Sequence, residues 1–191
     1  MTLFKAAALA ASAFAASPVL AADTFTIDPN HVWVTFSVNH AGWSQAQGIF
    51  HTVSGSITFD KDDVTKSAVT ATIDATSLDT NFDQRNKDLS SPDFLNTAEF
   101  STITFTSTAV EKTGDKTGKV TGTLDMIGAS VPVTLDVTFN NEGPDPFDPT
   151  ITKIGFSATG VVKPADFSMG KVADYGLGPD VVVTINAEAY K

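Results

Sequence analysis

The sequence contains no cysteine, and this absence excludes several kinds of site. Without thiols the chain cannot form a disulfide, use a cysteine nucleophile, or hold zinc, haem or an iron–sulfur cluster through cysteine. Basic residues are also scarce: 12 Lys and Arg stand against 22 Asp and Glu, a formal net charge of −10. Phosphate backbones and anionic lipid head groups attract basic segments and repel carboxylates. We therefore expect neither nucleic acid nor a charged membrane surface as a partner.

Residues 1–21 have the pattern of a signal peptide. One positive charge, Lys5, precedes an apolar run over 6–16, and small residues lead up to a cleavage site after Ala21. The run is too short and too rich in alanine to span a bilayer comfortably. The sequence predicts a secreted protein, periplasmic or exported, with no stable membrane insertion. Its mature domain, 22–191, then carries 11 basic against 22 acidic residues, a net charge of −11.

Strict alternation of apolar and polar residues dominates the mature domain. In the segment 31–38, for example, Val34 and Phe36 belong to one face while Thr35 and Ser37 belong to the other. One apolar face per strand is typical of an antiparallel sheet. The sequence therefore predicts an all-β fold of eight strands, because the same period recurs over 56–59, 69–75, 103–105, 120–126, 131–139, 154–158 and 181–187.

One interruption of this pattern is expected to be helical. Between 81 and 97, the residues Phe82, Arg85 and Leu89 fall at helical spacing, and the segment 91–93 (Ser-Pro-Asp) looks like a helix start. We expect one or two short helices here, between the third and fourth strands, crossing one end of the sheet. The remaining strands are expected to be joined by turns, because glycine and proline are frequent over 113–118, 127–130 and 142–149.

Eight antiparallel strands with one apolar face favour a closed barrel, because closure removes the exposed edges. A barrel of this size is either filled by side chains or holds one small ligand. The expected inward residues are mostly Val, Ala, Ile and Gly with scattered Phe, which indicates space along the barrel axis. A flattened sandwich could use the same residues, so both architectures stay open at this point.

No metal site or catalytic constellation is predicted. His31 and His40 begin and end one strand, too far apart to share a zinc ion, so we expect them and His51 to make local hydrogen bonds. The sequence has no Gly-x-Ser-x-Gly elbow and no glycine-rich phosphate loop. Carboxylates are expected mostly on solvent faces and turns, although a catalytic pair among them stays an alternative. The prediction is a protein without enzymatic activity or cofactor.

The single arginine, Arg85, has two interpretations. It lies beside Asp83 and near Asp88 and Asp93 in sequence, and a guanidinium group is well suited to pairing with carboxylates. Alternatively, it lies at the mouth of a pocket and contacts the polar head group of a ligand. Both interpretations stay open from the sequence alone.

A set of motifs, in order along nearly all of the mature chain, resembles the YceI-like polyisoprenoid-binding family of secreted bacterial proteins. The motifs are Thr26-Ile27-Asp28-Pro29-Asn30-His31, Phe36-Ser37-Val38-Asn39-His40, Gly48-Ile49-Phe50, the stretch 79–85, Ser91-Pro92-Asp93-Phe94, Ile103-Thr104-Phe105, and Gly122-Thr123-Leu124 with Gly128. The resemblance implies a lipocalin-like, eight-stranded barrel. It also implies a long isoprenoid tail, such as that of a polyprenyl phosphate or a quinone, in a lengthwise apolar pore.

The sequence departs from the family pattern in three places. Where the family usually has Asn-Arg-Ser-Asp-Phe-Gly, this chain has Lys-Pro-Ala-Asp-Phe-Ser over 163–168. Asn86 stands in place of the aspartate that usually follows the arginine, and Ser101 in place of a proline. Loss of the second arginine weakens the case for a pyrophosphate head group. It favours a neutral head, such as a quinone, or a simple fatty acid or amide.

Our hypothesis is a hydrophobic small-molecule carrier that transports or stores a long-chain isoprenoid lipid. The residues 81–97 would form a lid, with His40, Arg85 and Asp166 at the mouth. Two alternatives are a stress-linked barrel adaptor that binds a protein partner and an integral outer-membrane barrel; a homodimer also stays possible. The expected pore residues are Val34, Phe36, Val38, Phe50, Ile73, Phe105, Leu124, Met126, Val133, Leu135, Phe156, Val183 and Ile185.

Overall fold

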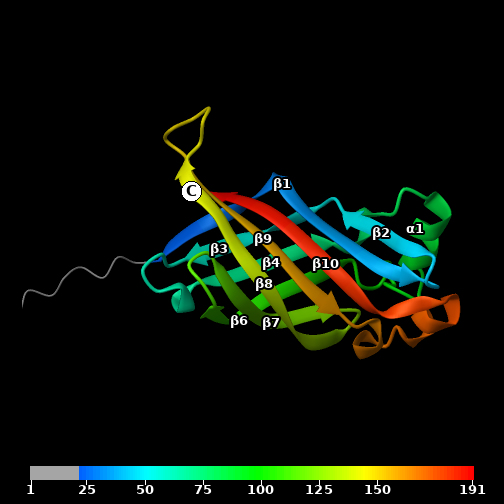
Figure 1. Cartoon of the computed structure of the whole chain (residues 1–191). Coiled ribbons are helices and arrows are strands. Elements are labelled where there is room, and N and C mark those ends of the chain that lie inside the picture. Colours follow the sequence, from blue (N-terminus) through cyan, green and yellow to red (C-terminus); the bar gives the residue numbers. More distant parts are fainter. Residues whose placement is uncertain (1–21) are drawn as a thin grey trace, which may run out of the picture.

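The alternating segments form one antiparallel sheet that closes on itself (Figure 1). The structure is a computed structural model that describes residues 22–191, so the expected signal peptide, 1–21, lies outside the described residues. Its strands are β1 (Asp23–His40), β2 (Ser44–Phe50), β3 (Val53–Phe59), β4 (Ala68–Asp74), β5 (Leu78–Asp79), β6 (Thr102–Lys112), β7 (Thr117–Met126), β8 (Ala129–Pro144), β9 (Thr152–Val162) and β10 (Leu177–Tyr190).

These strands occupy eight positions around a closed barrel. The order is β10-β9-β8-β7-β6-β4-β3-β1, and pairing of β10 with β1 closes the ring. β1 is 18 residues long and pairs with β3 through its first half and with β2 through its second. Only His51 and Thr52 separate β2 from β3, so the two strands share one barrel position. The predicted eight-stranded antiparallel, lipocalin-like barrel is confirmed.

The strand β2 was not predicted from the sequence. Its residues, Ser-Gln-Ala-Gln-Gly-Ile-Phe, contain few large apolar side chains at alternate positions, and the pattern is too weak to recognise. Pairing with β1 over the register Val34–Phe50 to His40–Ser44 forms the strand nevertheless. Here the tertiary partner, rather than local sequence preference, decides the structure.

Each strand turns its apolar face inward. In β8, Val133 is buried and faces the interior, whereas Thr134 and Asp136 are exposed on the outer surface. The largest buried cluster joins strands on opposite sides of the barrel with the segments that cover one end. Its buried members are Ile27, Val32, Val34, Phe50, Val53, Ala75, Leu78, Ile103, Met126 and Phe167.

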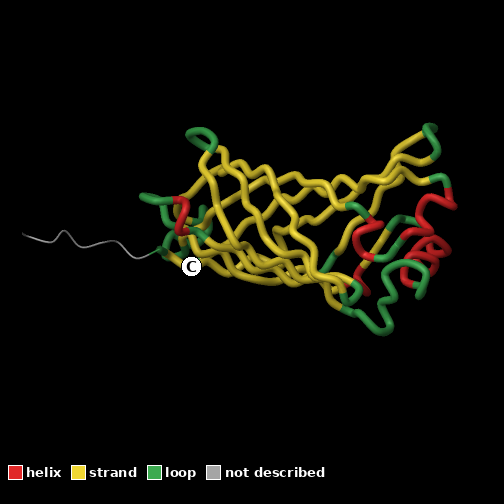
Figure 2. Tube along the Cα trace, turned by 90° about the horizontal axis from the view of Figure 1, so that it is seen from below, coloured by secondary structure: helices red, strands yellow, loops and turns green. Residues whose placement is uncertain are grey.

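Short helices gather mainly at one end of the barrel, on the right in Figure 2. This end, which we call the helical end, consists of the segments 40–44, 80–101, 126–130 and 163–176. It contains the α-helix α1 (Asp83–Ser90) and the 3-10 helices η3 (Pro164–Phe167) and η4 (Gly170–Tyr175). No helix in the described part of the chain has the length and apolar character needed to cross a bilayer.

The structure confirms the lower number of the one or two short helices expected over 81–97. α1 is that helix, and the chain then passes through turns, so the helix start expected at 91–93 is wrong. The amides of Phe94 and Asn96 both donate to the carbonyl of Ser91, and Asn96 has a positive φ of 46°. A residue in the left-handed conformation interrupts right-handed helical geometry, so the segment forms a compact turn.

The opposite end, which we call the hairpin end, consists of the loops 60–67, 113–116 and 145–151. Lys153 organises part of it, because its ammonium group lies 2.9 Å from Asp145 Oδ2 and 3.2 Å from Glu188 Oε2. Asp145 Oδ1 also accepts hydrogen bonds from the amides of Phe147 and Asp148, at 2.7 and 3.0 Å. These contacts, above all that with Lys153, lower the pKa of Asp145 from 3.8 to about 2.

We expect Asp145→Asn to destabilise the protein at neutral pH but not near pH 2. A lowered pKa means that the ionised carboxylate stabilises the fold fully above its unfolded pKa of 3.8, and that this contribution is lost as the pH falls through about 2. Urea unfolding of both proteins from pH 7 to pH 2 measures the difference in the free energy of unfolding. A difference that stays constant over this range would contradict the assignment.

Candidate ligand-binding cavity

A cavity of about 1090 Å³ runs along the inside of the barrel. Its wall extends from Arg85 and Leu89 at the helical end to Lys116 and Glu142 at the hairpin end. All thirteen residues expected in the pore line this cavity: Val34, Phe36, Val38, Phe50, Ile73, Phe105, Leu124, Met126, Val133, Leu135, Phe156, Val183 and Ile185. Their role in binding a ligand stays a prediction.

The side chains that point inward do not fill the barrel. Leu124, Leu135, Val183 and Ile185 all face the interior but are only half-buried. Protein interiors are normally close-packed, with few voids larger than a water molecule. The cavity of about 1090 Å³ is therefore far larger than the space that a single water molecule occupies.

Glycine residues in the wall help to keep the interior open. A Cβ atom at Gly48 would overlap the ring of Phe36, and one at Gly122 would overlap the ring of Phe105. Phe36 is the direct cross-strand partner of Gly48. Because glycine has no side chain, each ring lies against the wall of the barrel over a neighbouring strand. The aromatic groups therefore add apolar surface to the cavity wall.

At the helical end, a hydrogen-bond network around Thr80 positions α1. The side-chain oxygen Oδ1 of Asn86 accepts from the amide and the hydroxyl of Thr80, at 2.8 and 2.5 Å. Asn86 Nδ2 donates to Asp79 Oδ1 at 3.2 Å, and Arg85 Nη2 donates to the carbonyl of Thr80 at 2.6 Å. The pKa of Asp79 is lowered, first by the amide of Asn81 and then by Asn86 and His51.

The ion-pair interpretation of Arg85 is wrong. Among the described residues Arg85 forms no salt bridge, and Asp93 pairs instead with Lys171 of η4. Arg85 lines the cavity, and its Nε atom is buried without a hydrogen-bond partner in the described part of the chain. A buried donor without a partner is costly and is normally satisfied. Arg85 is therefore a residue of the cavity wall, and its contact with the head group of a ligand stays a prediction.

The two other residues expected at the mouth differ in placement. His40 ends β1 and lines the cavity. Asp166 is exposed on η3 and is not part of the cavity wall, so the expectation for this residue is wrong. Residues three apart share one side of a 3-10 helix. In η3, Pro164 and Phe167 take the buried side, which leaves Asp166 facing outward.

Sequence reasoning missed several cavity residues at the helical end. The apolar side chains of Leu89, Phe94, Leu95, Met169 and Val172 all line the cavity. Only Leu89 had a usable signal, its helical spacing from Arg85. The others lie in turns and short 3-10 segments, where no periodic pattern indicates which side faces inward.

Aromatic and charged groups line the cavity at the hairpin end. The rings of Phe59, Phe139 and Phe156 pack against one another with centroids 5.4 to 5.6 Å apart. Beyond them, Lys61 forms an ion pair of 3.2 Å with Glu142. Lys116 lies 6.0 Å from the centre of the Phe139 ring. The cavity thus has an apolar middle and polar groups at both ends.

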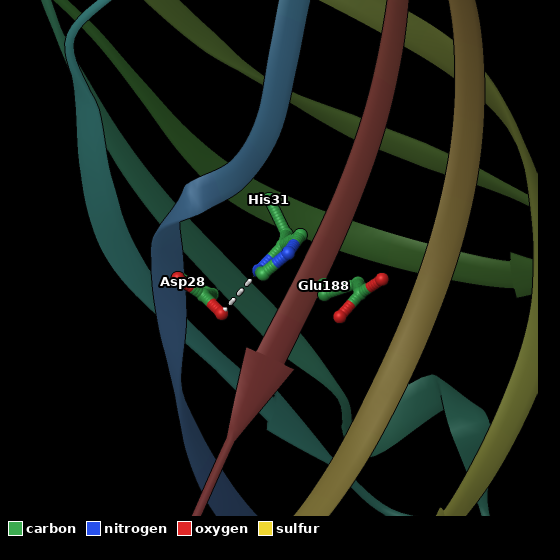
Figure 3. Close-up of side chains that lie close together, drawn as sticks. All are labelled: Asp28, His31 and Glu188. Carbon is green, nitrogen blue, oxygen red and sulfur yellow. Dashed lines mark hydrogen bonds and ion pairs between the residues drawn. The ribbon is translucent and has the colours of Figure 1, made fainter. Parts of the chain in front are cut away.

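A separate cluster of Asp28, His31 and Glu188 could in principle hold a cation (Figure 3). None of the three lines the cavity. His31 Nδ1 lies 2.8 Å from Asp28 Oδ2, and the ammonium group of Lys153 lies 4.0 Å from the same oxygen. Burial raises the pKa of Asp28, but hydrogen bonds from His31 and the Asn30 amide outweigh it and lower the pKa. Lys153 already supplies the positive charge of this cluster.

The sequence and this architecture match known proteins. The family model described as a YceI-like domain matches residues 25–189. The chain belongs to the YceI-like family. Protein YceI of Escherichia coli O6:H1 is 40% identical over 158 residues, which cover 82% of this chain and 81% of that protein. Protein YceI of Salmonella arizonae is 38% identical over 163 residues, 84% of this chain and 83% of its own length.

Solved structures show the same YceI-like fold. The Campylobacter jejuni YCEI protein has a TM-score of 0.71 at 30% identity, covering 78% of this chain and 86% of its own. BcnA of Burkholderia cenocepacia has a TM-score of 0.77 at 22% identity, covering 85% and 99%. A polyisoprenoid binding domain from Saccharophagus degradans has a TM-score of 0.62 at 17% identity, covering 86% and 97%.

The departures from the YceI-like pattern have structural consequences. Asn86, in place of aspartate, still provides the side-chain acceptor for Thr80. Pro164 stands where the family usually has arginine, and this apolar residue is buried and lines the cavity. Ser168, in place of glycine, has a positive φ of 63°, a conformation that glycine adopts more readily. The loss of arginine therefore makes the cavity wall less charged at the helical end.

We expect Gly48→Ala to lower the free energy of unfolding by about 1–3 kcal/mol, the usual cost of overpacking. The added methyl group would overlap Phe36 and force its ring toward the middle of the barrel. Gly143→Ala is a suitable control, because a Cβ atom there meets nothing within 4 Å. Urea unfolding measures both variants. Equal stability of the two would contradict the proposed close contact.

Proposed function

We propose that this YceI-like protein binds one long-chain isoprenoid lipid in its barrel, and transports or stores it in the periplasm or outside the cell. The observation that carries the proposal is the unfilled apolar cavity of about 1090 Å³. Its elongated form suits a long flexible tail better than a compact ligand. The related domain from Saccharophagus degradans, described as polyisoprenoid binding, adds support by analogy of fold.

The physical reason for such a carrier is the low solubility of the lipid. Each CH₂ group gains about 0.8 kcal/mol on leaving water for an apolar site. A chain of tens of carbons is therefore confined to a membrane unless a protein encloses it. Enclosure needs apolar wall area, a polar contact for the head group and a way in. It needs no catalytic groups, so the proposed role is not enzymatic.

The polar groups at the helical end favour a neutral head group. Arg85 and His40 both lie in the cavity wall there. Pro164 replaces the second arginine of the family pattern, so the wall provides one guanidinium group instead of two. One guanidinium suits a quinone carbonyl, whereas a pyrophosphate calls for more positive charge. We therefore propose a quinone as the ligand class.

Two alternatives fit the geometry less well. An adaptor that binds only a protein partner has no need for an open interior, because a filled core is more stable. An integral outer-membrane barrel turns its apolar side chains toward lipid. Here the apolar faces turn inward, and residues such as Thr134 and Asp136 occupy the outer surface of β8.

We expect the protein purified from its native host to contain a stoichiometric isoprenoid lipid. Enclosure along the barrel would make release into water very slow, because the whole tail would be exposed to solvent. Organic extraction followed by mass spectrometry identifies and quantifies the lipid. Recovery of no lipid, together with no binding of added quinone or polyprenol, would overturn the proposal.

We expect Phe36→Asp to lower the lipid content by on the order of tenfold or more, because it places a carboxylate against an apolar tail. Ser37→Asp is the matched control, since Ser37 is the next residue and is not part of the cavity wall. Leu135→Asp, at a cavity-wall residue of β8, is a second test if Phe36→Asp does not fold. Extracted lipid per folded protein is the measurement. Unchanged lipid in a folded Phe36→Asp or Leu135→Asp protein would contradict the pore assignment.

A further inference from the structure

Three aromatic side chains are exposed at the helical end. Trp43 is 88% exposed, and Phe82 and Tyr175 are each 58% exposed. They come from the turn after β1, the residue before α1 and the end of η4, segments far apart in sequence that meet at this end of the barrel (Figures 1 and 2). Large apolar side chains grouped on a surface commonly mark an interaction site.

Contacts between the segments place these aromatic groups at the helical end of the cavity. The amide of Ala41, in the turn that carries Trp43, donates to the carbonyl of Gly176 at 2.8 Å. The ring centre of Tyr175 lies 5.4 Å from that of Phe94, which lines the cavity. Phe82 and Tyr175 also line the cavity, whereas Trp43 does not. Trp43 therefore projects outward from the rim.

The helical end is somewhat less acidic for its length than the rest of the molecule. The 46 residues of its four segments hold four basic and six acidic side chains, a net charge of −2, whereas the other 124 of residues 22–191 carry a net charge of −9. A lipid surface without net charge would not repel the helical end, and the more acidic remainder of the protein would stay in water. Trp and Tyr are enriched where protein meets the membrane interface.

We propose that the helical end docks on a bilayer of zwitterionic lipid, with Trp43, Phe82 and Tyr175 in the interfacial layer. This inference rests on the proposed function, because an isoprenoid resides in the membrane before the protein takes it up. Docking at the rim lets the tail pass between the bilayer and the cavity without crossing water. Phe147, although 95% exposed, lies in the loop 145–151 at the opposite end, away from this surface.

Tryptophan fluorescence provides a direct test, because the chain has only two tryptophans. Trp33→Phe leaves Trp43 as the sole reporter at the rim, and Trp43→Phe leaves Trp33 on the barrel wall. Each variant is mixed with phosphatidylcholine vesicles that contain brominated acyl chains and no isoprenoid. We expect a blue shift and quenching of Trp43 and neither change for Trp33. Equal responses of the two reporters, or no response, would overturn the docking proposal.

Vesicle flotation then tests the contribution of the side chain. We expect Trp43→Gln to weaken partitioning onto phosphatidylcholine vesicles by about tenfold, since it removes one large apolar group. Phe147→Gln, the control at the hairpin end, should partition like the natural sequence. Trp43→Gln should also slow uptake of a quinone from vesicles while leaving unchanged the amount bound from detergent solution. Equal partitioning of the two variants would contradict the proposal.

The outcomes separate docking from the proposed function. Docking on isoprenoid-free vesicles without any uptake of quinone or polyprenol would support the membrane surface and overturn the isoprenoid ligand. Quinone binding from detergent without vesicle association would support the isoprenoid ligand and overturn bilayer docking. A Trp43 blue shift that depends on protein concentration in the absence of vesicles would assign this surface to a second copy of the chain and overturn bilayer docking.

Discussion

Hydrogen bonds between β1 and β10, over the register from Thr26–Tyr190 to His40–Leu177, close the sheet into a barrel. Closure forces one face of every strand toward a common axis, so the alternating apolar residues form an enclosed interior. An eight-stranded barrel is either filled by side chains or able to hold one small ligand, and here side chains such as Val183 and Ile185 line an open cavity. The cavity, its apolar wall and its two polar ends all depend on this single constraint.

The interior stays open at a cost in packing. Side chains that face an unfilled space lose contacts that a close-packed core would provide. Gly48 and Gly122 allow Phe36 and Phe105 to lie against the wall, which keeps aromatic surface while leaving the axis free. A tail that fills the cavity would restore the missing contacts. Ligand binding and stability are therefore coupled in this architecture.

At the helical end, one hydrogen-bond network fixes the position of the guanidinium group of Arg85. Asn86 holds Thr80, and the Thr80 carbonyl in turn holds one nitrogen of Arg85. This arrangement fixes the guanidinium group in the cavity wall while its Nε stays without a partner among the described residues. The carboxylates near Arg85 in sequence play no part, because Asp93 pairs with Lys171 and thereby links the 91–101 segment to η4.

The sequence by itself determined the class of fold, the number of barrel positions and the inward residues from Val34 to Ile185, because a period of two is a local property of each strand. Tertiary structure alone decided the strand β2, the turn after Ser91 and the outward direction of Asp166, since each depends on partners distant in sequence. It also showed that Arg85 forms no salt bridge among the described residues, although carboxylates lie close to it in sequence. Proximity along the chain suggested carboxylate partners, whereas the fold of the barrel placed the side chain in the cavity wall.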